Sequence, residues 1–159
     1  MNSIMTEYYP TFQLYQALRD QLMTILTDED LRYTPGGTNP PLGTLCRTIG
    51  EVEYAYIQSF KTFALDFSYR NTTAGLADSV RQLTAWFAAL DQDLRATIEG
   101  LSEDDITNRL IDRGGDFQLP PQIQLDVYKE ALLIFYGKVS VYLRAMGKSL
   151  PQQWQDWLG

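Results

Sequence analysis

The sequence predicts an all-α protein built as a four-helix bundle. Four long stretches repeat apolar side chains at alternating steps of three and four, the spacing that places them on one face of a helix. Strand-type alternation of comparable length is missing from the sequence, and segments rich in proline and glycine separate the four stretches. Amphipathic helices bury their apolar faces against one another, here with left-handed packing. At 159 residues the chain fits a single domain spanning 1–159.

The first helix is predicted over residues 11–26. An acidic turn at 27–30 follows, and its side chains are expected to cap a short turn through Leu31. Residues 33–41 contain three prolines and two adjacent glycines, so this segment is expected to be a loop. The predicted buried stripe of the first helix consists of Leu14, Leu18, Leu22 and Ile25.

The second helix is predicted to follow Asn39, which is expected to act as its N-cap, and to continue to Thr62. Residues 63–72 show no clear period but are aromatic, and they are expected to pack across one end of the bundle. The predicted buried face of the second helix consists of Leu42, Leu45, Ile49, Val52, Tyr56 and Phe60.

The third helix is predicted over 73–100, with Gly100 as its stop and Ser102 as the cap of a further short turn. A Gly-Gly pair inside 110–119 indicates a small hairpin. The irregular segments after the second and third helices allow crossover connections. The predicted stripe of the third helix consists of Leu76, Val80, Leu83, Phe87, Leu90, Leu94 and Ile98, with Trp86 beside it.

The fourth helix has clear limits, because Pro120 and Pro121 suit a first turn, Gly147 suits a C-terminal stop and Pro151 prevents resumption. Burying its apolar seam would contribute roughly 1.5–3 kcal/mol per side chain before chain entropy is subtracted, so this helix must belong to the core. The seam consists of Leu125, Tyr128, Leu132, Phe135, Val139, Tyr142 and Met146.

A second apolar row on the same helix contains Val127, Ile134 and Val141, with Leu133 and Gly137 close to it. Two explanations are open. Other helices of the same chain could cover this row, or it could form the contact of a homodimer, in which Gly137 lets a second backbone approach. A homodimer would explain the presence of Gly137, since a glycine inside a helix otherwise lowers helix stability by about 1 kcal/mol relative to alanine.

Composition excludes several classes of partner. A net charge of −7 with basic residues scattered singly argues against binding to nucleic acid, which requires clustered Lys and Arg. The longest uncharged apolar block, 131–137, is far shorter than the roughly 20 residues of a membrane span. We therefore expect a soluble, cytoplasmic protein without a membrane partner. The single cysteine, Cys46, lies in an apolar helical pattern and is expected to be a core residue and not a reactive thiol.

Three segments resemble the DinB-like family of bacterial four-helix bundles. They are LTDEDLRYTPGGTNPPLGTL at 26–45, LCRTIGEVEYAYIQSF at 45–60 and FYGKVSVYLRAMGKSLPQQW at 135–154. Their order and spacing follow the family's first helix, acidic turn, proline and glycine loop, second helix and closing motif. The resemblance implies a four-helix bundle over nearly the whole chain, and it adds weight to a homodimer, since DinB-like proteins commonly pair through helices of the bundle.

The resemblance also implies where a metal site would lie. Family members usually bind nickel or zinc through three histidines, and those members with an assigned chemistry transfer small thiols or isomerise a thiol adduct. The matching positions here are Thr48, Ala131 and Phe135, and the chain contains no histidine. A methyl group and a phenyl ring have no lone pair, and a threonine hydroxyl is a poor ligand for such metals. The sequence therefore predicts a member that has lost its metal site and binds no metal or other cofactor.

Carboxylates could supply only a different site. Glu51 lies one turn beyond Thr48, and Asp126 and Glu130 are four residues apart on the fourth helix, but a hard cation requires more converging oxygens. We expect Asp126 and Glu130 to be solvated. Glu51 is expected to be at least partly buried and bonded to Tyr128 or to Arg47.

Two functions remain open, and the sequence does not decide whether the protein is an enzyme. The first is a non-catalytic domain that binds a small ligand or a protein partner. The second is a metal-independent transferase that acts with a small thiol or a similar cosubstrate and uses Glu51 and a tyrosine hydroxyl. Both place the ligand in one pocket, which is bordered or filled by Thr48, Glu51, Tyr128, Ala131 and Phe135.

Overall fold

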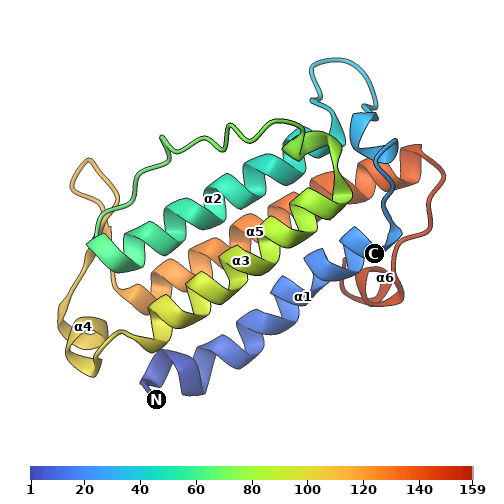
Figure 1. The fold of residues 1–159 in the computed structure, drawn as a ribbon. Helices are drawn as coiled ribbons and strands as arrows, with labels where there is room; N and C mark the ends of the chain where they lie inside the picture. Colours follow the sequence, from blue (N-terminus) through green and yellow to red (C-terminus); the bar gives the residue numbers. More distant parts are fainter. Residues whose placement is uncertain (159) are drawn as a thin grey trace.

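The computed structural model describes residues 1–158, which form an all-α bundle of long helices with shorter elements at its ends (Figure 1). The long helices are α1 (Tyr9–Ile25), α2 (Leu42–Thr62), α3 (Val80–Glu99) and α5 (Pro121–Ala145). The shorter elements are a π-helical turn (Ile4–Tyr8), 3-10 turns (Asp30–Arg32 and Leu76–Asp78), α4 (Glu103–Asn108), β1 (Ile111–Asp112), β2 (Gln118–Leu119) and α6 (Gln152–Leu158). None of the helices in this described range is long and apolar enough to cross a membrane.

The long helices pack so that α1 and α2 each contact both α3 and α5. Figure 1 shows that α2 and α3 run in the same direction, opposite to α1 and α5. The chain must therefore return along the bundle between α2 and α3, and residues 63–75 make this crossover. The expectation that this segment packs across one end of the bundle is wrong, because it runs along α2 and is held there by side chains.

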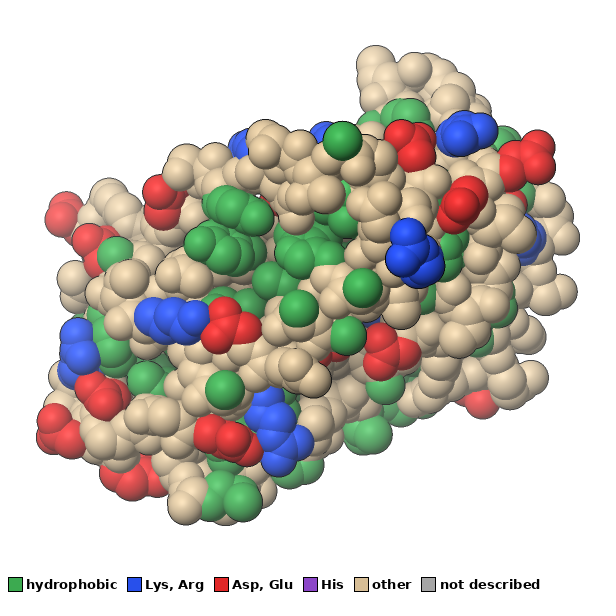
Figure 2. All heavy atoms as spheres, in the orientation of Figure 1, with side chains coloured by type: hydrophobic (Ala, Val, Ile, Leu, Met, Phe, Trp, Pro, Cys, Tyr) green, Lys and Arg blue, Asp and Glu red, His purple; other side chains and the backbone are tan. Residues whose placement is uncertain are grey.

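The crossover is held on α2 by aromatic packing. The ring of Tyr69 stacks on Tyr54 with 3.8 Å between the centroids, and the ring of Phe67 meets Tyr56 edge-on at 5.9 Å. Figure 2 shows hydrophobic side chains gathered over α2 beneath this segment. At its start, the crossover is tied to the hairpin, since the backbone N–H of Leu65 donates to the carbonyl oxygen of Asp112 at 2.8 Å.

The segment between α3 and α5 stays at one end of the bundle and carries α4 and the hairpin (Figure 1). Ser102 caps α4 as predicted, in a reciprocal arrangement with Asp105. The predicted hairpin is also present, because β1 and β2 pair antiparallel with Ile111 opposite Leu119. Gly114 and Gly115 both have positive φ angles, which explains why the turn requires glycine.

Three details of the helices differ from the sequence prediction. The third helix begins at Val80 and not near 73, because Gly75 at φ +73° interrupts the backbone and the Ser79 side chain then caps the new helix. The N-cap of α2 is Pro41 and not Asn39, whose side-chain amide instead donates to the carbonyl oxygen of Gly36 at 2.8 Å. On α1, Leu14 is 51% exposed, because the buried face of the helix contains Phe12 and the polar residues Gln16 and Arg19 in its place.

The core otherwise follows the predicted seams. On α5 every seam residue is buried except Met146, which is partly buried, and on α3 the stripe from Leu83 to Ile98 is buried. The segment after Gly147 adds an unpredicted anchor. Trp154 on α6 is completely buried, and its indole N–H donates to the carbonyl oxygen of Leu18 at 3.0 Å.

Two glycines let α2 approach its neighbours closely on the side of α3. A Cβ atom at Gly43 would lie 1.8 Å from the carbonyl oxygen of Ala77, and one at Gly50 would lie 2.4 Å from the ring of Trp86. Neither position therefore tolerates a side chain without movement of the neighbour.

Candidate functional site

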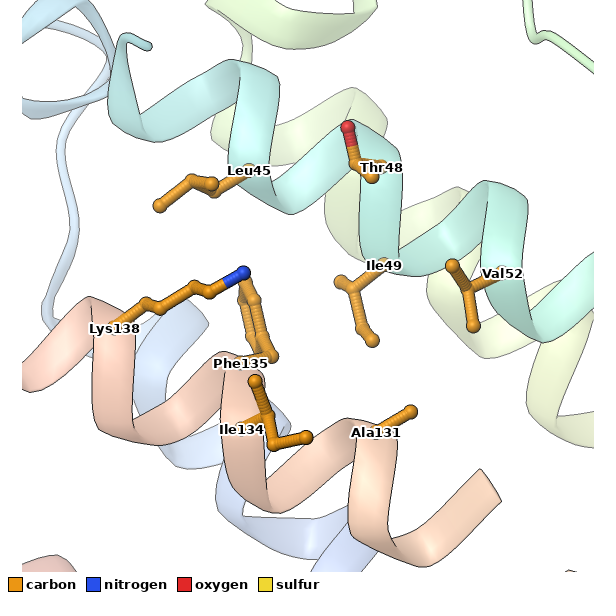
Figure 3. Close-up of a pocket in the computed structure, with 8 residues that line it drawn as sticks. All are labelled: Leu45, Thr48, Ile49, Val52, Ala131, Ile134, Phe135 and Lys138. Carbon is orange, nitrogen blue, oxygen red and sulfur yellow. The ribbon is translucent and has the colours of Figure 1, made fainter. Parts of the chain in front are cut away.

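A groove of about 210 Å³ lies between α2 and α5. Figure 3 shows Leu45 and Lys138 at one end of this groove and Val52 and Ala131 at the other. Lys138 is its only charged lining residue, so the groove is chemically an apolar surface. The α2 helix contributes Leu45, Thr48, Ile49 and Val52 to the lining, and α5 contributes Ala131, Ile134, Phe135 and Lys138.

The structure brings together the three positions at which the family resemblance places metal ligands. Thr48, Ala131 and Phe135 all line this groove, and Phe135 is only 5% exposed. In the view of Figure 3 the hydroxyl group of Thr48 points away from α5. These three side chains do not fit a transition metal, because a methyl group and a phenyl ring cannot coordinate one and the remaining hydroxyl is a weak ligand.

Other acidic side chains do not replace the missing ligands in the part of the chain described. Residues 1–158 contain no group of three or more Cys, Asp or Glu side chains placed to hold a metal ion. Asp126 pairs with Lys129 at 2.8 Å, and Glu130 is exposed, in agreement with the expectation that both are solvated.

A second, polar hollow of about 460 Å³ adjoins the groove across α2. It is lined by Arg47, Thr48, Glu51, Val52, Phe67 and Arg70, so Thr48 and Val52 belong to both depressions. Phe67 and Arg70 come from the crossover, and sequence analysis missed their contribution. The crossover lacks periodicity, so its sequence carried no signal of where Arg70 would lie. Its place is set in the structure by the stacking of Tyr69 on Tyr54 of α2.

Glu51 is buried and bonded, as predicted, at 7% exposure. Its Oε1 atom accepts a hydrogen bond of 3.0 Å from the backbone N–H of Asn71 and lies 3.6 Å from Nε of Arg47. Arg47 is therefore the partner of Glu51, whereas the alternative expectation of Tyr128 is wrong. The carboxylate ties the crossover to α2 and also faces the polar hollow.

Tyr128 does not line either depression. It is completely buried, with its ring 5.0 Å from the ring of Tyr56 and 5.5 Å from that of Phe12. Its hydroxyl group has no hydrogen-bond partner among the described residues. Burial, and then the negative charge of Glu53, raise the pKa of Tyr128 well above its usual value. Of the residues predicted to share one pocket, Tyr128 is thus the one that lines neither depression.

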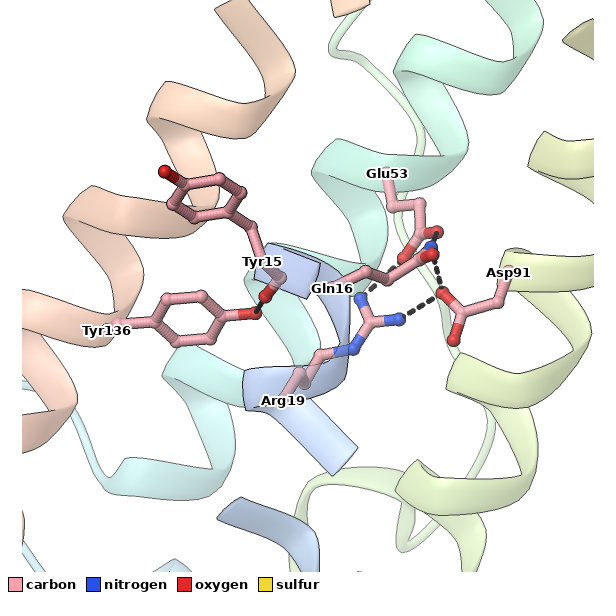
Figure 4. Close-up of polar contacts among 6 residues, drawn as sticks. All are labelled: Tyr15, Gln16, Arg19, Glu53, Asp91 and Tyr136. Carbon is pink, nitrogen blue, oxygen red and sulfur yellow. Dashed lines mark hydrogen bonds and ion pairs between the residues drawn. The ribbon is translucent and has the colours of Figure 1, made fainter. Parts of the chain in front are cut away.

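A buried ion cluster lies on the other side of α2 and was not predicted (Figure 4). Arg19 of α1 donates through Nη1 to Glu53 of α2 and through Nη2 to Asp91 of α3, and Gln16 donates to both carboxylates. The Arg19 and Glu53 side chains are fully buried, while that of Asp91 is 22% exposed. This cluster joins three helices through charge-assisted hydrogen bonds.

The cluster changes the proton affinity of its members. Burial raises the pKa of Asp91 to about 7, because lost solvation together with the charge of Glu53 outweighs the opposing effect of Arg19. For Arg19, burial alone would lower the pKa, but the carboxylate of Glu53 raises it well above its ordinary value. Cys46 is completely buried, and this burial raises the pKa of its thiol to about 12, consistent with a core residue.

The second apolar row of α5 is largely uncovered. Ile134 is 61% exposed and Val141 is 57% exposed, whereas Val127 is partly buried against the core. A Cβ atom at Gly137 would meet nothing within 4 Å. The possibility that other helices of the same chain cover this row is therefore wrong for Ile134 and Val141.

Comparison with known structures shows that this bundle shares its fold with a DinB-like protein. It is similar to the crystal structure of a DinB-like protein, YjoA, from Bacillus subtilis, with a TM-score of 0.69 at 19% sequence identity over 88% of this chain and 92% of that chain. The family model of the DinB superfamily matches residues 12–134, and the chain belongs to this superfamily. No curated protein matches the sequence.

Proposed function

We propose that this chain is a non-catalytic, small-ligand-binding member of the DinB superfamily whose metal site has been lost. The observation that carries the proposal is the convergence of Thr48, Ala131 and Phe135 in one apolar groove. Where the family resemblance implies imidazoles, this groove offers a methyl group and a phenyl ring. Such a lining favours contact with an apolar ligand, with polar groups at the edge to orient it.

The size of the site supports a small molecule. The groove of about 210 Å³ is smaller than a typical ligand pocket of roughly 300–1,000 Å³, but it adjoins the polar hollow along Thr48 and Val52. A macromolecular anion is a poorer candidate. On the face shown in Figure 2 the Lys and Arg side chains are scattered among Asp and Glu, and the net charge of the chain is −7.

Thermal stability tests this proposal. A ligand that binds only the folded state stabilises it by mass action, by about 2.7 kcal/mol at a concentration one hundred times its Kd. A library of small molecules should therefore contain compounds that raise the melting temperature. Ala131→Phe, which fills the groove, should abolish those shifts, and Ala88→Phe on the exposed face of α3 should preserve them. Shifts that survive in Ala131→Phe would place the ligand elsewhere.

A metal-independent transferase that uses a small thiol is a second candidate. Its support is the position of Glu51, which lines the polar hollow beside Arg47 and could accept a proton from a cosubstrate. Activity with a panel of thiols and electrophiles that disappears in Glu51→Gln, with unchanged folding, would favour the enzyme over the binding module. Equal, uncatalysed rates in both proteins would remove this candidate.

We also propose that the protein is a homodimer joined through α5. The support is the exposed row of Ile134 and Val141 with Gly137 between them, which presents apolar side chains and open space on one helical face. A two-fold axis would place this row against its own copy, with Val127 at its margin, and a stable contact should bury at least about 1,000 Å² in total.

A further inference from the structure

The polar hollow beside α2 carries more positive than negative charge. Arg47 and Arg70 both line it, and Glu51 is its only carboxylate. This is unusual for a chain with a net charge of −7. A locally positive depression on an acidic protein attracts small anions and excludes cations.

Both arginines retain donors that the protein does not satisfy. Arg70 donates through Nη1 to the backbone oxygens of Phe67 and Tyr69, each at 2.6 Å, and no carboxylate among residues 1–158 pairs with it. These two bonds hold the guanidinium in place without neutralising it. On Arg47, the Nε atom is shielded from solvent and has no hydrogen-bond acceptor in the described structure, since Glu51 lies 3.6 Å away. A guanidinium held in place without a carboxylate partner, as Arg70 is, keeps its positive charge and its remaining donors for an incoming anion.

The apolar groove adjoins the polar hollow that contains these arginines. Thr48 and Val52 line both depressions, so a molecule lying across them would have one end between the arginines and the other between α2 and α5. A groove of about 210 Å³ accommodates roughly seven non-hydrogen atoms, at about 30 Å³ each.

We propose that the ligand of this site is a small amphipathic anion, with its anionic head between Arg47 and Arg70 and its apolar chain in the groove beside Ile49 and Phe135. The inference rests on the proposed binding function and adds the chemical class of the ligand. A planar carboxylate suits the guanidinium groups, which present paired donors.

Calorimetric titration with octanoate and with 1-octanol, which have chains of equal length, tests the head group separately from the tail. Octanoate should bind at least about tenfold more tightly than 1-octanol, a difference of about 1.4 kcal/mol. Arg70→Gln should reduce octanoate binding to the level of 1-octanol and leave 1-octanol binding unchanged. Arg70→Lys should retain part of the preference, and Arg81→Gln, which removes an exposed charge on α3, should retain all of it.

The outcomes separate this inference from the binding function itself. Equal affinity for octanoate and 1-octanol would overturn the anion site while leaving the apolar groove as a ligand site. A preference for octanoate that survives in Arg70→Gln would also overturn it. Failure of both compounds to bind would reject the amphipathic anion, whereas compounds from the library that still depend on Ala131 would uphold the binding module.

Discussion

Arg19 and Glu53 form an ion pair, 2.5 Å between Nη1 and Oε2, in which both side chains are completely shielded from solvent. They come from α1 and α2, and Asp91 extends the pair to α3. Because a buried charge without a partner is far more costly than a paired one, the pair makes the positions of these helices mutually dependent.

Removing one member of the pair should strongly destabilise the fold. Glu53→Gln leaves the Arg19 guanidinium without its main acceptor, and we expect a loss of about 3–5 kcal/mol in the free energy of unfolding. Urea denaturation measures this loss. The double variant Arg19→Met with Glu53→Met should lose less free energy of unfolding than the single variants Arg19→Met and Glu53→Met lose in sum. In the double variant, no charge of the pair remains. Additive losses, or a loss below about 1 kcal/mol in Glu53→Gln, would show that the pair contributes little.

Asp91 should make stability depend on pH. Its pKa is about 7 in the folded protein and about 3.9 in an unfolded chain, so the folded state binds more protons between these values. The stabilisation from protonated Asp91 is fully present below about pH 4 and is lost as the pH rises through about 7. Asp91→Asn cannot lose a proton and should flatten this part of the profile, which chemical denaturation at a series of pH values records. Parallel profiles for the two proteins would contradict the prediction.

Phe135 should contribute to the core even though it borders the groove. Phe135→Ala is expected to cost about 3–5 kcal/mol, as a deletion of a buried aromatic ring does elsewhere. Leu14→Ala on α1 is the control from outside the groove and the proposed dimer contact, and because Leu14 is 51% exposed it should cost no more than about 0.5 kcal/mol. Thermal or urea unfolding of both variants gives the comparison. A change below about 1 kcal/mol in Phe135→Ala would mean that the ring does not support the core.

Ile134→Lys should convert a dimer into a folded monomer. The side chain is 61% exposed within one chain, so a lysine there should leave the chain folded, whereas in a contact with a second copy it would bury a charge. Sedimentation should show a species of twice 18.2 kDa for the parent protein and of 18.2 kDa for the variant. Ala88→Lys on α3 controls for the added charge and should stay dimeric. A parent protein that sediments only as an 18.2 kDa species at micromolar concentration ends the dimer proposal.

The purified protein should hold no stoichiometric nickel or zinc once any polyhistidine tag is removed. Its groove offers Thr48 where an imidazole would be needed, and Ala131 and Phe135 offer no ligand atom. Elemental analysis after dialysis against a chelator measures the metal content. A content near one metal ion per chain would show that ligands from another part of the protein had been overlooked.

The long helices could be predicted because their apolar periods are strong and their ends carry proline, glycine or serine. The same signals indicated the hairpin and the cap of α4. Periodicity could not indicate the ion cluster, since a charged residue such as Glu53 within a helix resembles a solvated one until its partner on another helix is known. Arg70 was missed for a different reason. It lies on a segment without a period, and its place depends on the stacking of Tyr69 against Tyr54.

Sequence reasoning was more successful for the groove than for the pocket as a whole. The residue matching that placed Thr48, Ala131 and Phe135 together depended on helix positions, and all three line the groove. Tyr128 was misplaced because it shares the seam of α5 with Phe135 but lies almost two turns nearer the start of the helix, where the core is closed by Tyr56 and Phe12.

The close approach at Gly43 and Gly50 restricts how this site can deform. On that side α2 is in backbone contact with the turn at Ala77 and in ring contact with Trp86, so a sliding movement of α2 along α3 would force atoms into each other. One wall of the groove is thereby fixed to the rest of the bundle. If a bulkier ligand requires a wider groove, the change must come from the α5 side, through new rotamers of Ile134 and Lys138 or an outward tilt of α5.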